Sequence, residues 1–343
     1  MNIPILPMLI ASFTTFVAIF LLRPFAISID LVDEPNKRKL HAGSVPLIGG
    51  IAMYIGVVVS ILATSNDLNQ LNYFLLASLI IVMVGVLDDH RNISISLRLL
   101  VQMVVGIIII TVGDIRIESL GNLLGNGEII LNKWTYFVSI MAIITGINAL
   151  NMSDGIHGLA GGSSLITFLA IIYLSIGSIS HSSLLIMALL CSVLPVFLIY
   201  NLCLGISESK RVFMGDAGSM FIGLVIAWLL IHQSQGEDRA FAPVTALWLF
   251  AVPLIEISVV ILRRIISGKS PFKPDLYHSH HLLIGLGVGK KSTLLILTLF
   301  SLLMAVIGIL GELYGVTEWV MFVGFLLIYG IYIFFYRMAL RKI

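Results

Sequence analysis

The sequence predicts an all-α polytopic membrane protein with about eleven transmembrane helices. Hydrophobic residues make up 59% of its 343 residues and charged residues only 11%, whereas soluble domains carry about 25% charged residues. A membrane-spanning helix needs roughly 20 apolar residues, and eleven runs come close to that length. They lie at 4–22, 47–64, 71–87, 97–112, 134–150, 159–179, 184–204, 217–232, 242–262, 293–311 and 318–336. No soluble region of domain size separates them, so we expect one integral membrane domain over residues 1–343.

The lysines and arginines predict the orientation of these spans. With eleven crossings the loops alternate between two sides, and all 20 basic residues except Arg116, Lys133 and Arg239 fall on one side. Positive charge favours the cytoplasmic side, which places the N-terminus in the periplasm and the C-terminus in the cytoplasm. Arg23 follows the first run instead of preceding it, which argues for a retained first span over a cleaved signal peptide.

The third run ends in two adjacent carboxylates, Asp88 and Asp89, in the stretch VGVLDDH. Neighbouring carboxylates repel each other and raise the cost of ionisation. A divalent cation relieves that repulsion, and Mg2+ prefers carboxylate oxygens. The alternative is a solvated boundary at a helix end, and the pair alone does not decide between the two interpretations.

Two other loops on the same side contain motifs with glycines. The first reads LVDEPNKRKLHAGSVPLIGG over 31–50. Its basic cluster could serve only to orient the protein in the membrane, through anionic lipid headgroups. Pro46 and Gly49–Gly50 predict a backbone that bends as it enters the membrane. The other loop reads SESKRVFMGDAGS over 207–219, with Asp216 between two glycines. Asp216 is either the N-cap of the next helix or a metal-binding carboxylate.

The loop GINALNMSDGIHGLAGG, at 146–162, places polar groups at membrane depth. An aspartate at a helix centre there costs about 2.5–3.5 kcal/mol. Asn148, Asn151 and Asp154 recur every three residues, which predicts one helical face. The glycines permit either close approach of a ligand or close helix crossing. Helix crossing does not explain the asparagines and the aspartate.

The last inner loop contains three histidines within four residues, His278, His280 and His281, among basic side chains. A zinc site is one interpretation, although no cysteine lies nearby. Donors for phosphate oxygens fit the surrounding positive charge better, and an inert surface cluster is the third possibility. Glu256 is the only charge well inside a span. We expect it to pair with a neighbouring helix or reach toward Arg263, outside the site.

All these motifs fall on the predicted cytoplasmic side. Carboxylates with a cation, together with histidine donors and a basic loop, suit a nucleotide diphosphate, because phosphoryl transfer needs positioning and charge neutralisation. We therefore expect the motifs to converge on one active site at the cytoplasmic face, which could use a water-soluble substrate and a lipid-dissolved one.

The motifs resemble those of the polyprenyl-phosphate N-acetylhexosamine-1-phosphate transferases, most closely the bacterial undecaprenyl-phosphate N-acetylglucosamine branch. The resembling stretches keep the family's order over residues 33–281. They are DEPNKRKLHAGSVPLIGG, GVLDD, NALNMSDGIHGLAGG, RVFMGDAGS, SGKSPFKPD and HSHH. Each stretch alone is weak evidence for the family, but six stretches in the family's order are specific for it. VPLIGG and HSHH favour the N-acetylglucosamine branch over the phospho-N-acetylmuramoyl-pentapeptide branch.

The resemblance implies transfer of N-acetylglucosamine 1-phosphate from UDP-N-acetylglucosamine to undecaprenyl phosphate, with release of UMP and with Mg2+ or Mn2+ as cofactor. Asp88 and Asp89 match the family's catalytic acidic pair, and Asp88 is the better candidate for the group that activates the lipid phosphate. Asp216, together with Asp88, matches the metal site. Phe213 matches the aromatic residue that stacks on uracil.

The resemblance also assigns the remaining polar residues. Asn151 and Asp154 match the lining of the nucleotide-sugar cleft, and the histidines at 278, 280 and 281 match a motif that engages the diphosphate or the sugar. His157 departs from the family, which usually has a second aspartate there, beside the uracil. A neutral histidine offers both a donor and an acceptor. Uridine recognition is still implied, whereas the identity of the UDP-N-acetylhexosamine stays open.

The resemblance further implies a multi-pass protein of the bacterial inner membrane that initiates cell-surface polysaccharide (O-antigen-type) synthesis. We expect no nucleic-acid partner, and a homodimer is compatible with the sequence. Two other classes of membrane protein fit the sequence less well. A secondary transporter would place its site at the midplane and show internal repeats, whereas these motifs gather on one side and no repeat is visible. A membrane scaffold without chemistry is suggested only by His157.

Overall fold

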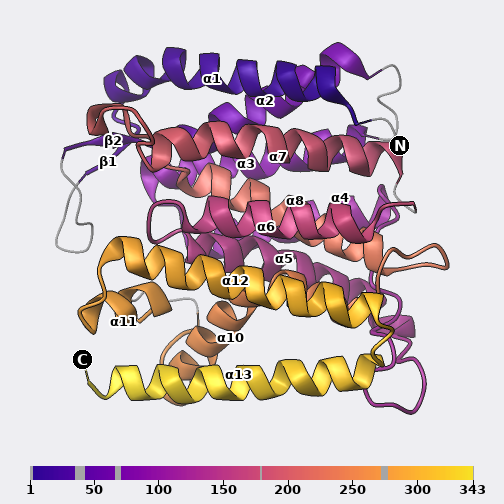
Figure 1. Cartoon of the computed structure of the whole chain (residues 1–343). Coiled ribbons are helices and arrows are strands. Elements are labelled where there is room, and N and C mark those ends of the chain that lie inside the picture. Colours follow the sequence, from indigo (N-terminus) through magenta and orange to yellow (C-terminus); the bar gives the residue numbers. More distant parts are fainter. Residues whose placement is uncertain (1–2, 35–42, 66–70, 178–179, 272–276, 343) are drawn as a thin grey trace. The chain divides into compact units, whose positions relative to one another are not determined.

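The computed structural model describes residues 3–34, 43–65, 71–177, 180–271 and 277–342. Within these residues the chain forms thirteen α-helices and one two-stranded sheet (Figure 1). The helices are α1 (Ile5–Ser28), α2 (Gly49–Thr64), α3 (Asn72–Arg91), α4 (Ile95–Thr111), α5 (Thr135–Ser153), α6 (Leu159–Leu174), α7 (His181–Asn201), α8 (Gly215–Ser234), α9 (Pro243–Leu249), α10 (Ala251–Ile266), α11 (Ser279–Gly285), α12 (Lys290–Leu313) and α13 (Glu318–Leu340). Every predicted run corresponds to one helix, except 242–262, which forms α9 and α10.

The helices confirm the prediction of an all-helical polytopic membrane protein. In the described part of the chain, seven helices are long and apolar enough to cross a membrane. The pair α9 and α10 would make an eighth span, bent by 85°. The remaining three predicted spans are the shorter helices α2, α4 and α6, of 16 or 17 residues. The count of eleven spans and their orientation stay predictions.

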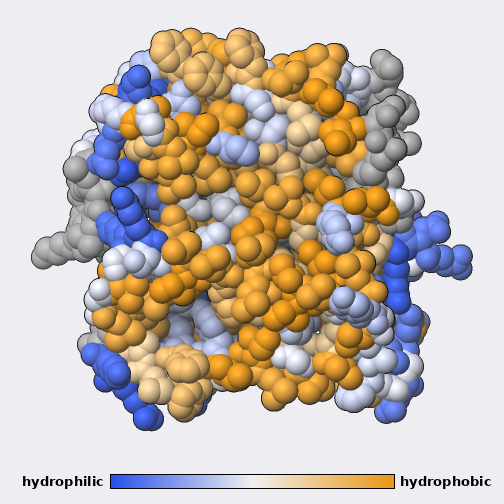
Figure 2. Space-filling view, in the orientation of Figure 1, coloured by the Kyte–Doolittle hydropathy of each residue, from blue (hydrophilic) through white to orange (hydrophobic). Residues whose placement is uncertain are grey.

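Hydrophobic side chains cover the outer surfaces of the long helices, as membrane contact requires. On α13, for example, Leu327 is 64% exposed, and Leu299 on α12 is 54% exposed. Figure 2 shows these surfaces as largely hydrophobic, with hydrophilic side chains gathered near the helix ends. Large apolar side chains on the surface of a soluble protein would favour aggregation, whereas lipid solvates them.

The chain packs as two compact units. Unit 1 comprises residues 1–115 and 179–226. In it α1 packs against α2 and α7, and α3 packs against α4. Strand β1 (Val32–Asp33) pairs antiparallel with β2 (Val45–Pro46), in a register that aligns Val32 with Pro46. This sheet leads into α2 at Gly49, where the proline and glycines predicted a bend.

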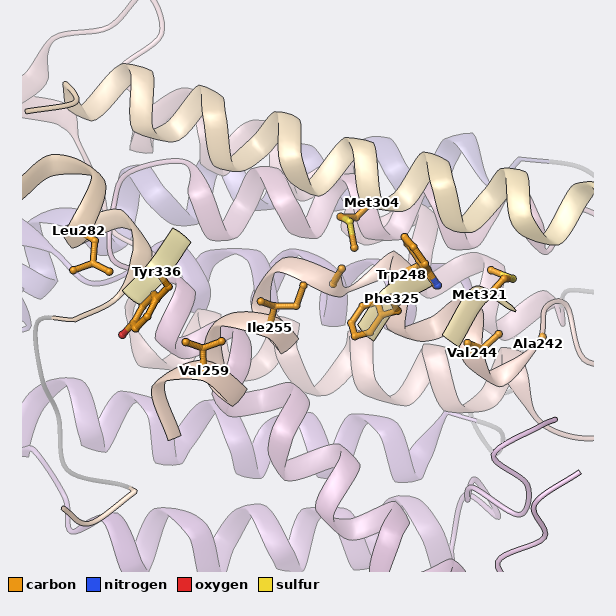
Figure 3. Packing of buried hydrophobic residues seen from close by; sticks show 11 residues of the cluster. Ala242, Val244, Trp248, Ile255, Val259, Leu282, Met304, Met321, Phe325 and Tyr336 are labelled. Atoms are coloured by element: carbon orange, nitrogen blue, oxygen red, sulfur yellow. The ribbon is translucent and has the colours of Figure 1, made fainter. Parts of the chain in front are cut away.

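Unit 2 comprises residues 116–178 and 227–343. In it α10 packs against α5, and α12 against α6 and α9. A buried apolar cluster joins α9, α10, α12 and α13 around Trp248, whose ring meets Phe325 edge-on at 5.6 Å (Figure 3). The expected single run bends at Phe250, because Pro253 has no N–H to bond to Leu249 and favours the first turn of a new helix. The expectation of one domain over residues 1–343 stays a prediction.

Candidate active site

In unit 1 the acidic pair lies in the last turn of α3, and each carboxylate has a different partner. Asp88 is 6% exposed. Its Oδ2 lies 2.9 Å from Nη1 of Arg98, which α4 contributes. Asp89 accepts the backbone N–H of Asp216 at 2.8 Å and of Ala217 at 3.2 Å. The two neighbours therefore differ in role: Asp88 forms an ion pair, and Asp89 binds the start of α8.

The contact between Asp89 and α8 follows from helix chemistry. The first N–H groups of a helix have no partner within it, and a negative charge is favourable there. Asp89 supplies both the acceptors and the charge from another helix. Because Asp89 already accepts these N–H groups, they do not require Asp216 to act as the N-cap of its own helix. Asp216 stands in the first turn of α8 and is half-buried.

Glycines make this approach of α3 and α8 possible. A Cβ at Gly85 would lie 2.3 Å from Cα of Ala217, a distance that atoms do not tolerate. Gly215 has φ +71°, in the left-handed region, and a Cβ there would lie 2.5 Å from Oδ2 of Asp89. The two helices can meet at this distance only because both positions lack a side chain.

The VPLIGG and VFMGDAG motifs are joined by backbone hydrogen bonds. Phe213 donates its N–H to the carbonyl of Pro46 at 2.9 Å and accepts the N–H of Gly49 at 2.8 Å. Gly50 donates to Met214 at 2.9 Å, and a Cβ on Gly50 would lie 2.1 Å from Cα of Gly218. This pairing holds half-buried Phe213 and the start of α8 in place. Three motifs that lie far apart in sequence thus meet in unit 1.

The carboxylate of Asp89 is close enough to that of Asp216, and to that of Asp88, to interact with each electrostatically. Their oxygens are the hard donors that Mg2+ prefers. Both oxygens of Asp89 already accept N–H groups, so Asp88 and Asp216 are better placed as ligands. No group of three or more His, Cys, Asp or Glu side chains in the described residues is arranged to hold a metal alone. The residues fit Mg2+, which usually takes one or two carboxylates plus water and substrate phosphates.

In unit 2 the third loop, defined here as residues 146–162, begins within the last turns of α5. Asn148 and Asn151 lie in the last turns of α5, and Asp154 follows as its C-cap, with its N–H bonded to Asn151. The predicted helical face is therefore present up to the end of the helix. Gly158 has φ +83° and opens α6. Half-buried His157 lies in the turn between the two helices.

The third loop contacts the histidine segment, defined here as residues 277–281. A Cβ at Gly155 would lie 2.0 Å from Nε2 of His280, so a side chain there would force this ring to shift. The ring planes of His278 and His280 stack within 6° at 5.6 Å, and His281 lies 4.2 Å from His280 between centroids. The structure thus brings the predicted nucleotide-sugar loop and the predicted histidine motif together.

The side chain of His280 is buried, at 3% exposure. Burial, together with the neighbouring charges of His281 and His278, lowers the pKa of His280 from 6.5 to about 3. Its ring is therefore neutral at physiological pH. Its Nε2 has no hydrogen-bond partner among the described residues, and this buried nitrogen faces Gly155.

Three contributing residues were missed from the sequence. Arg98 pairs with Asp88, although the acidic pair has no adjacent basic residue in the chain. Glu256 was left outside the site, yet it binds His278 and Ser279 instead of Arg263. Tyr332 joins it from α13. The one available signal was the isolated charge of Glu256 within a span, because such charges in membranes usually serve function.

Parts of two predicted motifs lie outside the described residues. They are 35–42, with Lys37, Arg38 and Lys39, and 272–276, with Lys273. The expected convergence of the unit 1 acids and the unit 2 polar residues on one cation stays a prediction, as do the individual roles of the site residues.

Comparison with known proteins identifies the family. The model of "Glycosyl transferase family 4" matches residues 71–234. Three relatives named undecaprenyl-phosphate alpha-N-acetylglucosaminyl 1-phosphate transferase align over nearly the whole chain. The protein of Haemophilus influenzae is 40% identical, covering 95% of this chain and 93% of its own. The protein of Yersinia pestis is 39% identical, covering 94% and 88%, and that of Escherichia coli K12 is 38% identical, covering 93% and 87%. The six ordered motifs thus predicted the family correctly, and the chain belongs to glycosyl transferase family 4, as do these sugar 1-phosphate transferases.

Proposed function

We propose that the protein transfers N-acetylglucosamine 1-phosphate from UDP-N-acetylglucosamine to undecaprenyl phosphate and releases UMP. The observation that carries this proposal is the meeting of the VPLIGG, LDD and FMGDAG motifs around the start of α8. Relatives named for this activity are about 40% identical over almost the whole chain. The names of the relatives indicate the substrates, and the residues around the start of α8 have side chains that suit phosphoryl transfer.

In the proposed reaction a phosphate oxygen of the lipid attacks the sugar-bound phosphorus of UDP-N-acetylglucosamine. The bond from that phosphorus to the bridging oxygen breaks, and the bridging oxygen leaves with UMP. Asp88 accepts the proton of the lipid phosphate on Oδ1, while Arg98 holds Oδ2. Asp89 keeps the first turn of α8, and with it Asp216, in place.

Asp216 would hold the Mg2+ or Mn2+, which supplies charge neutralisation for the phosphate oxygens when bound. Asp88 is the second expected ligand, and its Oδ1 would bind the ion before it takes up the proton. Phe213 would stack on the uracil, and Asn151, Asp154 and His157 would line the nucleotide-sugar cleft. The histidine segment would contact the diphosphate or the sugar. The neutral ring of His280 would do so through a single N–H or lone pair.

We further propose eleven spans in the bacterial inner membrane, with the N-terminus in the periplasm and both the site and the C-terminus on the cytoplasmic side. The positive-inside distribution of basic residues supports this orientation. The shorter helices α2, α4 and α6 would be about 24–26 Å long at 1.5 Å per residue, slightly less than the hydrocarbon core of about 30 Å. The lipid-linked product would serve as the starting unit for a cell-surface polysaccharide of the O-antigen type.

A panel of UDP-sugars tests the function and its specificity together. Purified protein in detergent would receive undecaprenyl phosphate, Mg2+ and each UDP-sugar in turn, and UMP release would be measured. We expect release with UDP-N-acetylglucosamine. Release only with another UDP-N-acetylhexosamine would revise the sugar and point to His157, whereas release with none would contradict the enzymatic proposal and favour a scaffold.

A further inference from the structure

Glu256 is a buried carboxylate that the proposed mechanism does not use. It lies in α10 and is 4% exposed, next to Ile255 of the apolar cluster drawn in Figure 3. A buried charge is costly unless hydrogen bonds compensate it. The position of this carboxylate therefore requires an explanation, and its partners supply one.

Four donors surround the carboxylate, and three of them belong to the histidine segment. Oε1 lies 3.2 Å from Nδ1 of His278 and accepts the N–H of Ser279 at 2.9 Å. Oε2 accepts the hydroxyl of Ser279 and that of Tyr332, the latter at 2.7 Å. A set of donors on both oxygens suits an ionised carboxylate, which only accepts hydrogen bonds.

The last helix adds a second attachment for the same segment. Tyr332 and Tyr336 are one turn apart on α13 and therefore lie on one face. The hydroxyl of Tyr336 donates to the carbonyl of Tyr277, and Figure 3 shows Tyr336 at the Leu282 end of the cluster. Glu256 and the two tyrosines together hold residues 277–279 from the side of the apolar core.

We propose that Glu256 is a positioning residue that fixes the ring and tautomer of His278 and the first turn of α11. The proposal rests on the proposed function, in which the histidine segment engages the UDP-sugar. Because an ionised carboxylate cannot donate, the proton must lie on Nδ1 of His278. Nε2 is then the ring nitrogen left for the substrate. Carboxylates that orient a metal-ligating histidine in this way typically contribute about 10- to 100-fold to affinity or activity, and we expect an effect of the same order here.

The two oxygens of Glu256 make separable contributions. Oε1 holds His278, whereas Oε2 holds only hydroxyl groups. Glu256→Gln keeps an acceptor at Oε1, and the amide can donate to both hydroxyls, so it should act as the conservative replacement. Glu256→Met fills similar space without an acceptor and should release the histidine.

Glu312 offers a matched control on α12 of the same unit. It also accepts one backbone N–H, from Ala242 at 3.1 Å, and one hydroxyl, from Thr245, and among the described residues none of its hydrogen bonds involves a histidine. A general loss of packing would affect Glu312→Met and Glu256→Met alike. A loss of active protein would lower kcat and leave both KM values unchanged.

The experiment combines steady-state kinetics with 15N NMR of histidine-labelled protein. For Glu256→Met we expect the KM for UDP-N-acetylglucosamine to rise about tenfold or more, with the KM for undecaprenyl phosphate unchanged. Glu256→Gln should stay within about threefold of wild type, and Glu312→Met should leave both KM values unchanged. A Glu256→Met enzyme with the wild-type KM for UDP-N-acetylglucosamine would overturn the proposal.

The NMR measurement needs no substrate and no folded Met variant. The His278 signals, identified by their loss in His278→Asn, should show a proton on Nδ1 in the wild-type protein. An unprotonated Nδ1 would overturn the proposal even if Glu256→Met failed to fold. If the wild-type enzyme released no UMP, the proposed function would fail, while the NMR result would still decide whether Glu256 fixes His278.

Discussion

The carboxylate of Asp89 binds the backbone of Asp216: the N–H of Asp216 donates to Oδ1 over 2.8 Å, and the next N–H donates to Oδ2. Asp89 of the LDD motif therefore holds α8, the helix that contains Asp216. Its neighbour Asp88 faces Arg98 instead. The acidic pair thus divides into a structural member and a member available for chemistry, and the first prediction tests this division.

Asp89→Asn should lower both stability and turnover. An asparagine amide can accept only one of the two N–H groups, and its NH2 would oppose the other. Loss of a helix cap typically costs about 1 kcal/mol, which should appear as a lower midpoint of thermal unfolding in detergent. Asp88→Asn keeps an acceptor for Arg98, so we expect near-normal unfolding but no UMP release. Equal unfolding midpoints for the two variants would contradict the division of roles.

Gly85→Ala should separate α3 from α8. The added Cβ would lie 2.3 Å from backbone Cα of Ala217, and a backbone neighbour cannot rotate away. Overpacking of this kind costs about 1–3 kcal/mol, and the displaced Asp89 should also lose its hold on α8. Thermal unfolding and UMP release measure both effects. Gly330→Ala on α13 is the control, because its Cβ meets nothing within 4 Å, and it should leave both measurements unchanged.

Gly155→Ala should disturb the histidine segment without breaking the helices. Its Cβ would lie 2.0 Å from Nε2 of His280, so the ring must shift. We expect the KM for UDP-N-acetylglucosamine to rise at least several-fold, with the unfolding midpoint close to that of the wild type. Gly162→Ala serves as a control, because its nearest neighbour is a side-chain atom of Thr298 at 3.9 Å. Similar KM values for both variants would show that His280 does not contact the nucleotide sugar.

His280 should make the protein less stable in acid. Its pKa is lowered by burial to about 3 in the folded protein, while the unfolded chain binds the proton near 6.5. The unfolded state therefore binds more protons between these values. The contribution of His280 is complete above pH 6.5 and is lost as the pH falls toward 3. Unfolding midpoints at pH 7.5 and 5 should differ less in His280→Gln than in the wild type; an equal difference would contradict burial of a neutral ring.

Removal of divalent cations should stop turnover without unfolding the protein. Asp89 interacts electrostatically with both Asp88 and Asp216, and the described residues form no all-protein metal cage, which suits a weakly held Mg2+. We expect EDTA to abolish UMP release and added Mg2+ to restore it. Asp216→Asn should raise the Mg2+ concentration for half-maximal activity or abolish activity. Full turnover of Asp216→Asn at wild-type Mg2+ levels would exclude Asp216 as a ligand.

The sequence predicted the helices better than the partners of individual residues. Apolar runs locate every helix except α11, with α9 and α10 in a single run, because burial in lipid depends on composition alone. The break at Phe250 was missed because the residues on both sides of it are apolar. Asp89 and Glu256 bind groups 127 and 23 residues away in the chain, and no local pattern encodes such contacts. The sequence carried no signal for Gly85, and for Gly155 it predicted a close approach without identifying His280 as the neighbour, because each neighbour comes from another segment.

The transfer reaction itself can be followed with a single label. UDP-N-acetylglucosamine labelled with 32P on the sugar-bound phosphate would be incubated with the purified protein, undecaprenyl phosphate and Mg2+. We expect the label to enter the lipid extract, with one UMP released for each labelled lipid and no transfer by Asp88→Asn. Label that stays in the aqueous phase, or appears there as UDP, would contradict this expectation.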